Sequence, residues 1–309
     1  NRSDLWRVVK PLVRAIESAE GTLSSDDSIS EKPYTDENNL IAWHWSQSFE
    51  RHVKGLEFLT AYYNVGDVSL PIAFDLVEKN EAYVDAKTGK AKRRSPLSKN
   101  QRYLMLLRIA VHNQVLFRYV LNDVWFASAK NMKSVKLELK KDFLMPLKSN
   151  RKVALSKEAQ QQGQYVRIDE LGLEAGTTRT VYLEGVDFPL QVVKQVFTNG
   201  DGSVGLLYLV TNDLELPYDG ITTLYGKRWN VEPYHKSLKQ NASLSLSPTK
   251  TVTTQSNHLF ASLCAYIKLE MLKVTTQTNH FALKSKLYLR AVRTAFDTLS
   301  QMQPIRFAA

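Results

Sequence analysis

Four side chains in the last third of the chain have the types and the spacing to act together on a phosphate. They are the phenol of Tyr225, the guanidinium of Arg228, the carboxylate of Glu232 and the amine of Lys239. On a helix that turns about 100° per residue, their gaps of three, four and seven positions place them on one narrow stripe. A stripe that faced a core would be apolar. Here the carboxylate could hold a metal ion and the cations could hold phosphate groups.

The stretch Y-x2-R-x3-E-x6-K resembles the signature of the bacterial insertion-sequence transposases, whose catalytic domain is ribonuclease H-like and carries an Asp-Asp-Glu triad. The resemblance extends to other segments and covers nearly the whole chain. It implies that Glu232 is the third acid, that Arg228 binds a phosphate in bidentate fashion and that Lys239 binds one as a point charge. The DNA-binding residues predicted around this stretch are Tyr225, Arg228, Trp229, His235, Lys236 and Lys239.

Some of these side chains have a second interpretation. Glu232 could instead be an exposed carboxylate that pairs with Lys236 four residues later, an interaction worth only about 0.2–0.5 kcal/mol. Trp229 could stack on a base or face the protein core, and Tyr225 could hydrogen-bond a phosphate or pack against the end nucleotide. The matches at all four spaced positions favour the catalytic interpretation of Glu232.

Pro233, directly after the expected acid, departs from the family pattern. A proline inside a helix removes one hydrogen bond and costs about 3 kcal/mol unless a break is built in. We therefore predict a bend here, with Asn230 capping a new helix and Pro233 in its first turn. Such a bend would weaken the single-face arrangement between Arg228 and Lys239.

The other two acids are expected on or after predicted strands. Asp123 follows an apolar run and precedes Val-Trp-Phe, which is similar to the family's Asp-x-Trp-Phe element; it could otherwise cap the next helix. Asp26-Asp27-Ser28 fits the family's Asp-x-Ser/Thr pattern with Asp26 as the metal ligand. Neighbouring strand residues point to opposite faces, so only one of the two adjacent acids can enter the site. Asp26 is the predicted ligand and Asp27 the alternative.

Phosphoryl transfer on DNA needs two divalent cations, about 3.5–4 Å apart, that act on the attacking and leaving oxygens. Magnesium takes oxygen ligands and keeps several waters, so two or three carboxylates suffice to hold it. The resemblance implies two Mg²⁺ ions on Asp26, Asp123 and Glu232, with Mn²⁺ able to substitute. It also implies that the partner is double-stranded DNA, as transposon ends and as target, bound by a homodimer on paired ends.

The elements that must position these residues follow from apolar spacing and turn signals. They are a helix over 4–20 with Gly21 as its C-cap, strands over 22–29, 53–65 and 68–77, a helix over 98–115 with Ser98 as its N-cap, a strand over 117–121, a helix over 131–140, a strand over 143–147 with Pro146 at an edge or strand end, and helices over 255–273 and 277–302. The order strand-strand-strand-helix-strand-helix-strand is that of a ribonuclease H-like core.

Residues 151–217 come where that core would next need the helix with its last acid. They are rich in β-prone runs, and Thr198-Asn199-Gly200-Asp201-Gly202 predicts a hairpin turn. The predicted fold is α/β, a ribonuclease H-like mixed sheet with flanking helices, interrupted by a β-rich insertion before the last catalytic helix. The predicted parts are an N-terminal helix over 1–21 left from a longer region, the first part of the core over 22–150, the insertion over 151–217, and the catalytic-glutamate helix with the C-terminal helices over 218–309.

The insertion lacks one feature of related enzymes, which stack a flipped base on an insertion tryptophan. All five tryptophans lie outside residues 151–217. Tyr165, Tyr182 or Phe188 could take that place, because any flat ring can stack on a base. The sequence therefore allows a hairpin intermediate at the DNA end but does not predict one.

Composition agrees with a polyanion partner. The 309-residue chain has 41 Lys and Arg residues against 31 Asp and Glu residues, a net charge of +10, and such cations release counterions from phosphates. A basic loop over 87–94 could follow the DNA backbone or be a solvated face. The single cysteine, Cys264, excludes an internal disulfide and a thiolate zinc site. With no apolar run near roughly 18 residues and no visible signal peptide, we expect no membrane partner and a cytoplasmic, nucleoid-associated bacterial protein.

Together these features predict a DNA transposase that catalyses metal-dependent strand cleavage at transposon ends and 3′-OH strand transfer into target DNA. One alternative is a ribonuclease H-like nuclease without strand transfer. The other is a catalytically inactive DNA-binding derivative, suggested by Pro233 and by the start of the chain at Asn1. We expect a small helical region that helps to grip transposon ends to precede this start in similar proteins.

Overall fold

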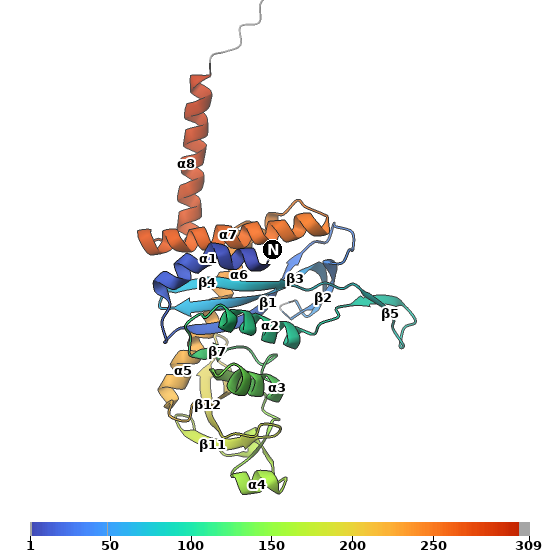
Figure 1. Cartoon of the computed structure of the whole chain (residues 1–309), viewed down its shortest axis with the longest axis vertical. Helices are drawn as coiled ribbons and strands as arrows, with labels where there is room; N and C mark the ends of the chain where they lie inside the picture. Colours follow the sequence, from blue (N-terminus) through green and yellow to red (C-terminus); the bar gives the residue numbers. More distant parts are fainter. Residues whose placement is uncertain (1, 48, 303–309) are drawn as a thin grey trace, which may run out of the picture.

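The computed structural model describes residues 2–47 and 49–302, and a large mixed sheet with helices packed against it dominates this part of the chain (Figure 1). The central strands, in spatial order, are β4 (Val68–Leu76), β3 (Arg51–Val65), β1 (Thr22–Glu31), β7 (Tyr119–Leu121) and β8 (Asp142–Leu147). β3 is antiparallel to both β4 and β1, whereas β7 is parallel to β1 and β8 is parallel to β7. The predicted α/β class and mixed sheet are confirmed.

The predicted antiparallel strands form because their apolar, β-prone residues cover a core-facing surface. β3 and β4 are joined by a tight turn at Gly66, whose φ of +53° favours glycine. One further strand, β2 (Ile41–Ser46), lies outside the predicted strands and pairs with the first residues of β3. Its alternating pattern leaves Trp43 and Trp45 about half exposed, at 51% and 49%.

Helices cover both faces of the central strands. Successive residues of β3 point to opposite faces. On one face, the Tyr62 ring lies 4.6 Å from the Tyr234 ring of α6 (Val231–Gln240). On the other face, Glu57 lies 2.6 Å from Lys99 at the start of α2 (Lys99–His112). α7 (Val252–Thr276) packs against α6 and β4, and α1 (Arg2–Ile16) packs against β4 and α7.

The two predicted helix caps have different outcomes. Ser98 is confirmed as an N-cap, because its side chain and that of Gln101 form a capping box at the start of α2. The prediction for Gly21 is wrong, because α1 ends at Ile16 and Gly21 does not have a positive φ. Gly21 instead permits a close approach: a Cβ there would lie 2.5 Å from the Tyr63 hydroxyl oxygen.

The signature stretch does not form one straight helix. α5 (Tyr218–Gly226) is followed by a 3₁₀ turn (Lys227–Asn230) and then by α6. The predicted break is present, but it lies at Lys227–Asn230, before Glu232, and not at Pro233. Pro233 is the third residue of α6, where a missing N–H costs least. The predicted capping by Asn230 is wrong, because its backbone is helical and its side chain makes no cap hydrogen bond.

The insertion continues the sheet instead of forming a separate layer. Its strands, in spatial order from β8 outward, are β13 (Val204–Thr211), β12 (Leu190–Thr198), β11 (Thr178–Leu183), β9 (Lys152–Ala154) and β10 (Val166–Arg167). The predicted turn joins β12 to β13, with Gly202 at a φ of +83°. Pro146 of β8 is opposite Leu209 of β13 and lies beyond Leu144, where the pairing with β7 ends. Two positions were predicted for Pro146. The strand end is confirmed, and the sheet edge is wrong because β13 pairs with β8 there.

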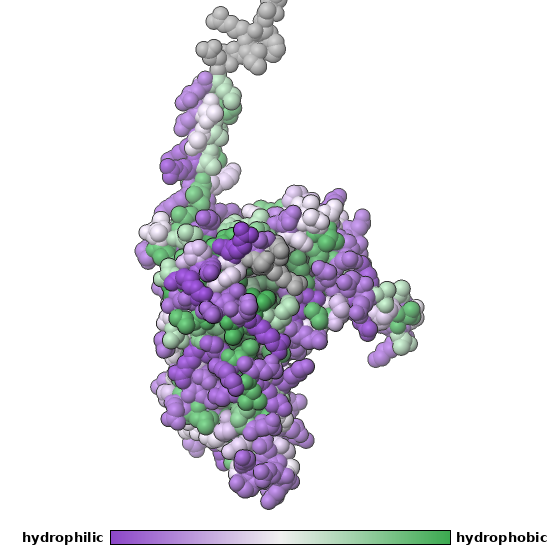
Figure 2. Space-filling view, viewed as in Figure 1, coloured by the Kyte–Doolittle hydropathy of each residue, from purple (hydrophilic) through white to green (hydrophobic). Residues whose placement is uncertain are grey.

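The remaining helices are short except for the last one. They are α3 (Ala129–Lys133), which continues as a π-helical turn (Ser134–Glu138), α4 (Lys157–Gln161), two 3₁₀ turns (Ile168–Glu170 and Leu244–Leu246) and α8 (His280–Gln301). α8 projects away from the body (Figure 1), and Figure 2 shows apolar residues along one side of it. Of its side chains, His280 and Leu283 are buried.

The basic segment expected as a loop over 87–94 is in part a strand. β5 (Glu81–Val84) and β6 (Ala91–Arg94) form a two-stranded hairpin that projects from the body (Figure 1). Among residues 2–47 and 49–302, no helix has the length and apolar character needed to cross a bilayer.

Candidate active site

Asp26 and Asp123 are brought side by side by two parallel strands. Ser24 of β1 is in register with Leu121 of β7. Two residues onward from this pair are Asp26, still in β1, and Asp123, just past the end of β7. Both acids line one cavity of about 800 Å³. The structure thus places the two acids predicted to come first and second in one site.

The surroundings of Asp26 and Asp123 disfavour the ionised form of both carboxylates and so raise their pKa values. Burial, followed by the negative charges of Asp27 and Asp123, raises the pKa of Asp26 to about 7. Burial also raises the pKa of Asp123, although the Trp125 N–H and the Arg228 charge act in the opposite direction. Crowded carboxylates in a poorly solvated place resist ionisation. A divalent cation would relieve that crowding, so the pair fits a Mg²⁺ site.

Asp27 lines the same cavity but already has a cationic partner. Its carboxylate lies 2.9 Å from the Lys99 amine, which is also 2.6 Å from Glu57. Glu57 in turn lies 2.8 Å from Nδ1 of His44. Asp26 is on the face of β1 that α6 covers, and Asp27 is on the face that α2 covers. This geometry favours Asp26 over Asp27 as the metal ligand.

Asp123 also borders a second cavity of about 610 Å³, which three signature residues line. The Arg228 guanidinium lies 4.5 Å from the centre of the Trp229 ring and 5.7 Å from that of Tyr225. Nε of Arg228 is buried and has no hydrogen-bond partner among the described residues. The Tyr225 hydroxyl donates a 3.4 Å hydrogen bond to the carbonyl of Asn122. Arg228 therefore presents an unsatisfied donor beside Asp123, and Tyr225 holds its helix against the loop that carries this acid.

Glu232 is not gathered with the other two acids. Its side chain is 58% exposed, lines neither cavity and lies 3.8 Å from the Arg228 guanidinium. Within the described ranges, no three His, Cys, Asp or Glu side chains lie close enough together to hold a metal ion. The 3₁₀ turn between Arg228 and Glu232 changes the helical register.

The later residues of α6 divide according to the face that they occupy. Lys239 lines the cavity with Asp26 and Asp123, and burial lowers its pKa. Lys236, one turn after Glu232, is exposed with its amine 5.4 Å from the Phe281 ring. The structure thus brings Lys239 to the acids and leaves Lys236 on the outer side of the helix.

His235 faces the sheet and packs edge-on against Phe58, with ring centres 6.1 Å apart. Its Nε2 atom is buried and finds no hydrogen-bond partner within residues 2–47 and 49–302. Burial, followed by the charge of Lys239, lowers the pKa of His235 to about 3, so the ring is neutral at pH 7. This position suits packing better than contact with a phosphate.

An aromatic residue of the insertion borders the site, although not one of those expected from the sequence. Phe197, near the end of β12, is 43% exposed and lines the cavity with Asp123 and Trp229. Tyr165, Tyr182 and Phe188 are absent from the linings of both cavities next to Asp123. The signal that could have identified Phe197 is its place directly before the predicted hairpin turn.

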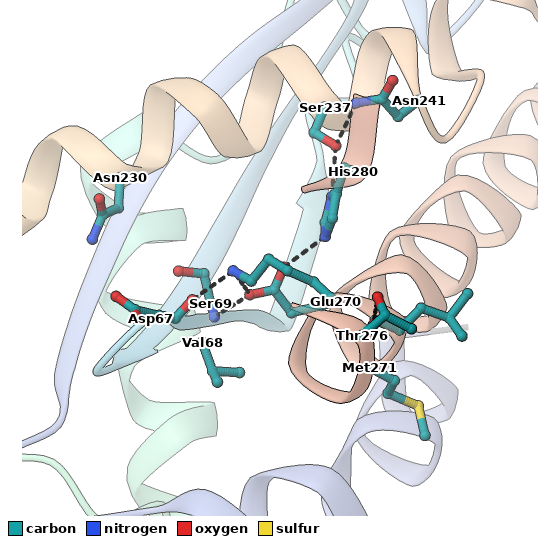
Figure 3. A network of polar contacts seen from close by, with 12 residues as sticks. Asp67, Val68, Ser69, Asn230, Ser237, Asn241, Glu270, Met271, Thr276 and His280 are labelled. Atoms are coloured by element: carbon teal, nitrogen blue, oxygen red, sulfur yellow. Dashed lines mark hydrogen bonds and ion pairs between the residues drawn. The ribbon is translucent and has the colours of Figure 1, made fainter. Parts of the chain in front are cut away.

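A buried polar network fixes α6 against its neighbours (Figure 3). Ser237 of α6 lies 2.8 Å from Nδ1 of His280, the first residue of α8. Nε2 of His280 lies 2.8 Å from Glu270 of α7, which also accepts a 2.9 Å hydrogen bond from the Ser69 N–H of β4. Lys273 completes the network at 2.5 Å from Glu270. These contacts set the position of the helix that carries Glu232 and Lys239.

Comparison with known proteins places this chain in a family. A family model described as a transposase DDE domain matches residues 97–268, more than half of the 309-residue chain. Among solved structures, an Endonuclease V from Bacillus subtilis is similar at 11% identity and a TM-score of 0.26, over 73% of this chain and 80% of that chain. No curated protein matches the chain.

Proposed function

Because this chain belongs to the transposase DDE-domain family, we propose that it catalyses metal-dependent cleavage at transposon ends and 3′-OH strand transfer into target DNA. The observation that carries the proposal is the parallel register of β1 and β7, which brings Asp26 and Asp123 into one cavity with Lys239. Carboxylates beside phosphate-binding cations are what phosphoryl transfer on DNA requires.

The sheet supports a ribonuclease H-like core. Its order β4-β3-β1-β7-β8, with an antiparallel half and a parallel half, is the arrangement expected for that fold. We assign the first part of the core to residues 22–150, the insertion to 151–217 and the catalytic-glutamate helix with the C-terminal helices to 218–309. The helix before residue 22 packs against this core.

Asp26 and Asp123 would hold the divalent cations, with Glu232 joining them once it separates from Arg228. Two bound Mg²⁺ ions, or Mn²⁺ in their place, would activate the attacking oxygen and stabilise the leaving one. The pKa of Asp26, raised to about 7, means that proton loss accompanies cation binding at neutral pH. Cation affinity should therefore rise with pH through this range.

The surrounding residues of the chain would bind and orient the DNA. Arg228, with its buried and unpaired Nε, would take a phosphate next to Asp123. Lys239 would hold a phosphate on the other side of the acids. Trp229, 54% exposed, would stack on a base, as would Phe197. Paired DNA ends would be bound by a homodimer.

Arg228→Ala is expected to slow strand transfer about 10–100-fold, because it removes charge-assisted hydrogen bonds to a phosphate. The Arg228 charge also lowers the pKa of both Asp26 and Asp123, so its loss should move the acidic limb of the pH–rate profile to higher pH. Arg228→Lys should keep that limb in place but restore only part of the rate, since lysine cannot bind in bidentate fashion. Single-turnover joining rates would measure both effects. Lys227→Ala, which removes the neighbouring cation, is the control.

The function itself is tested with the wild-type chain, DNA that carries the element's ends, and Mg²⁺. We expect nicking at the end and joining of a pre-cut 3′ end to plasmid DNA, both abolished by EDTA. Nicking without joining would support a nuclease. Tight, metal-independent binding with neither reaction would support an inactive DNA-binding derivative. Either result would overturn the proposal.

A further inference from the structure

The β5–β6 hairpin, called the arm below and covering residues 81–94, is an ordered projection. Its two strands pair from Glu81–Arg94 to Val84–Ala91 and form a sheet of their own. The carboxylate of Asp85 closes the turn by accepting hydrogen bonds from backbone N–H groups two and three residues later, at 3.1 and 2.9 Å. Gly89, with a φ of +66°, completes the turn. The tip therefore has a defined shape that can present side chains to a partner.

The arm carries an excess of positive charge, and the unpaired part of it lies at the tip. The arm has five cationic and two acidic side chains. Lys92 pairs with Asp85 and Arg94 pairs with Glu81, whereas Arg93 reaches Glu37 of the body. Lys87 and Lys90, at the tip, are exposed and form no ion pair within the described part of the chain. The tip thus presents two free cations to solvent.

The arm begins and ends at the rim of the active-site cavity. Val77 and Lys79 on one side of it, and Ser95 and Leu97 on the other, line the cavity that contains Asp26. A polymer that entered this cavity to reach the acids would pass along the arm as it left. At about 3.3 Å per residue, a six-residue rise places the tip roughly 20 Å beyond the root.

The chemistry of the arm suits a nucleic acid better than a protein. Its large exposed apolar side chains, Tyr83 and Val84, are adjacent in β5 and point to opposite faces, so they form no joint apolar patch. The Arg94 guanidinium lies over the Tyr83 ring at 5.6 Å. A two-stranded ribbon fits the DNA major groove, and free lysines bind backbone phosphates.

We infer that the arm grips the DNA duplex that flanks the reacting phosphate, with Lys87 and Lys90 on backbone phosphates. The inference rests on the proposed function, because it takes the occupant of the cavity to be DNA. It adds a contact that lies outside the signature stretch. The contact is sequence-independent and serves to hold the duplex in line with the cavity.

The test is the salt dependence of duplex binding by a Lys87→Ala/Lys90→Ala variant, measured by fluorescence anisotropy with a random-sequence duplex of about 30 base pairs. Losing two phosphate contacts should reduce the slope of log K against log salt by about 1.8 and weaken binding about 10–100-fold near 0.1 M salt. Lys10→Ala/Lys268→Ala is the matched control: both lysines are exposed, lie on α1 and α7 and line neither cavity next to Asp123. The control should keep the wild-type slope.

An unchanged slope in the arm variant, with a wild type that cleaves and joins DNA, would overturn the arm proposal and leave the proposed function standing. A wild type that binds duplex with the expected slope but does not cleave would overturn the function and leave the arm contact standing. A wild type that binds no duplex would overturn both. A second readout is a photo-crosslinker on Lys87→Cys in a Cys264→Ser background, which should attach to duplex DNA, whereas the same label on Lys10→Cys should not.

Discussion

Asp26→Asn should be unable to cleave DNA and yet be more stable than the wild type near neutral pH without divalent cations. The first effect follows from the loss of a cation ligand, which should lower cleavage by at least about 10³-fold. The second follows from the raised pKa of Asp26, about 7 against about 3.9 in an unfolded chain. Between pH 4 and 7 the unfolded chain loses a proton that the folded protein retains. Wild-type stability therefore falls as pH rises through this window, by at most about 4 kcal/mol.

Urea unfolding in EDTA at pH 5 and pH 7.5 measures this difference. The gain from Asp26→Asn should be small at pH 5 and large at pH 7.5, and Mg²⁺ should stabilise the wild type but not the variant. Asp27→Asn is the control, because Asp27 is paired with Lys99 on the opposite face. Burial raises the pKa of Asp27 as well, so this variant is a control for cleavage, which it should retain, and not for stability. Equal cleavage by the two variants would show that Asp26 has no specific role in the reaction.

Glu270→Ala should destabilise the protein by about 3–5 kcal/mol, the second large effect expected of a single substitution. It would leave His280 and Lys273 without their buried partner and the Ser69 N–H without its acceptor. Burial alone would raise the pKa of Glu270, but contacts from His280, Lys273 and Ser69 outweigh it and hold that pKa below its ordinary value. The stabilisation is therefore present above about pH 4.3 and is lost as pH falls through the lowered pKa.

Chemical unfolding followed by circular dichroism at pH 7 and pH 3 tests this expectation. The gap between wild type and Glu270→Ala should be widest at pH 7 and should shrink at pH 3. Lys268→Ala, an exposed position on the same helix, should change stability by less than about 0.5 kcal/mol. An equal effect of the two substitutions would mean that the network does not hold α6 in place.

The sequence predicts the order of elements in the core because their apolar periods are strong and their turns are marked. The strands that became β1, β3, β4, β7 and β8, and the Ser98 cap of α2, all follow from local signals. Only the resemblance to a family predicts that Asp26 and Asp123 share one site. No local signal states that β1 and β7 are parallel neighbours, since that depends on the whole sheet.

Other features depend on tertiary packing and so lie beyond sequence reasoning. Pro233 signals a break, but the direction in which Glu232 turns depends on the 3₁₀ turn that precedes it. In α6, His235 and Lys239 are partly buried toward the sheet, whereas Glu232 and Lys236 are exposed. The sequence likewise does not predict that β13 extends the main sheet, because β13 pairs with β8, whose residues lie about 65 positions earlier in the chain.

The central claim is that Asp26, Asp123 and Glu232 jointly hold two divalent cations next to a DNA end. The most direct measurement is anomalous scattering from Mn²⁺ in crystals of the protein with a pre-cut DNA end. We predict two peaks about 3.5–4 Å apart between Asp26 and Asp123, with Glu232 turned away from Arg228 and onto one of them. Peaks that are absent from this pair, or that lie instead at Asp27 and Glu57, would contradict the claim.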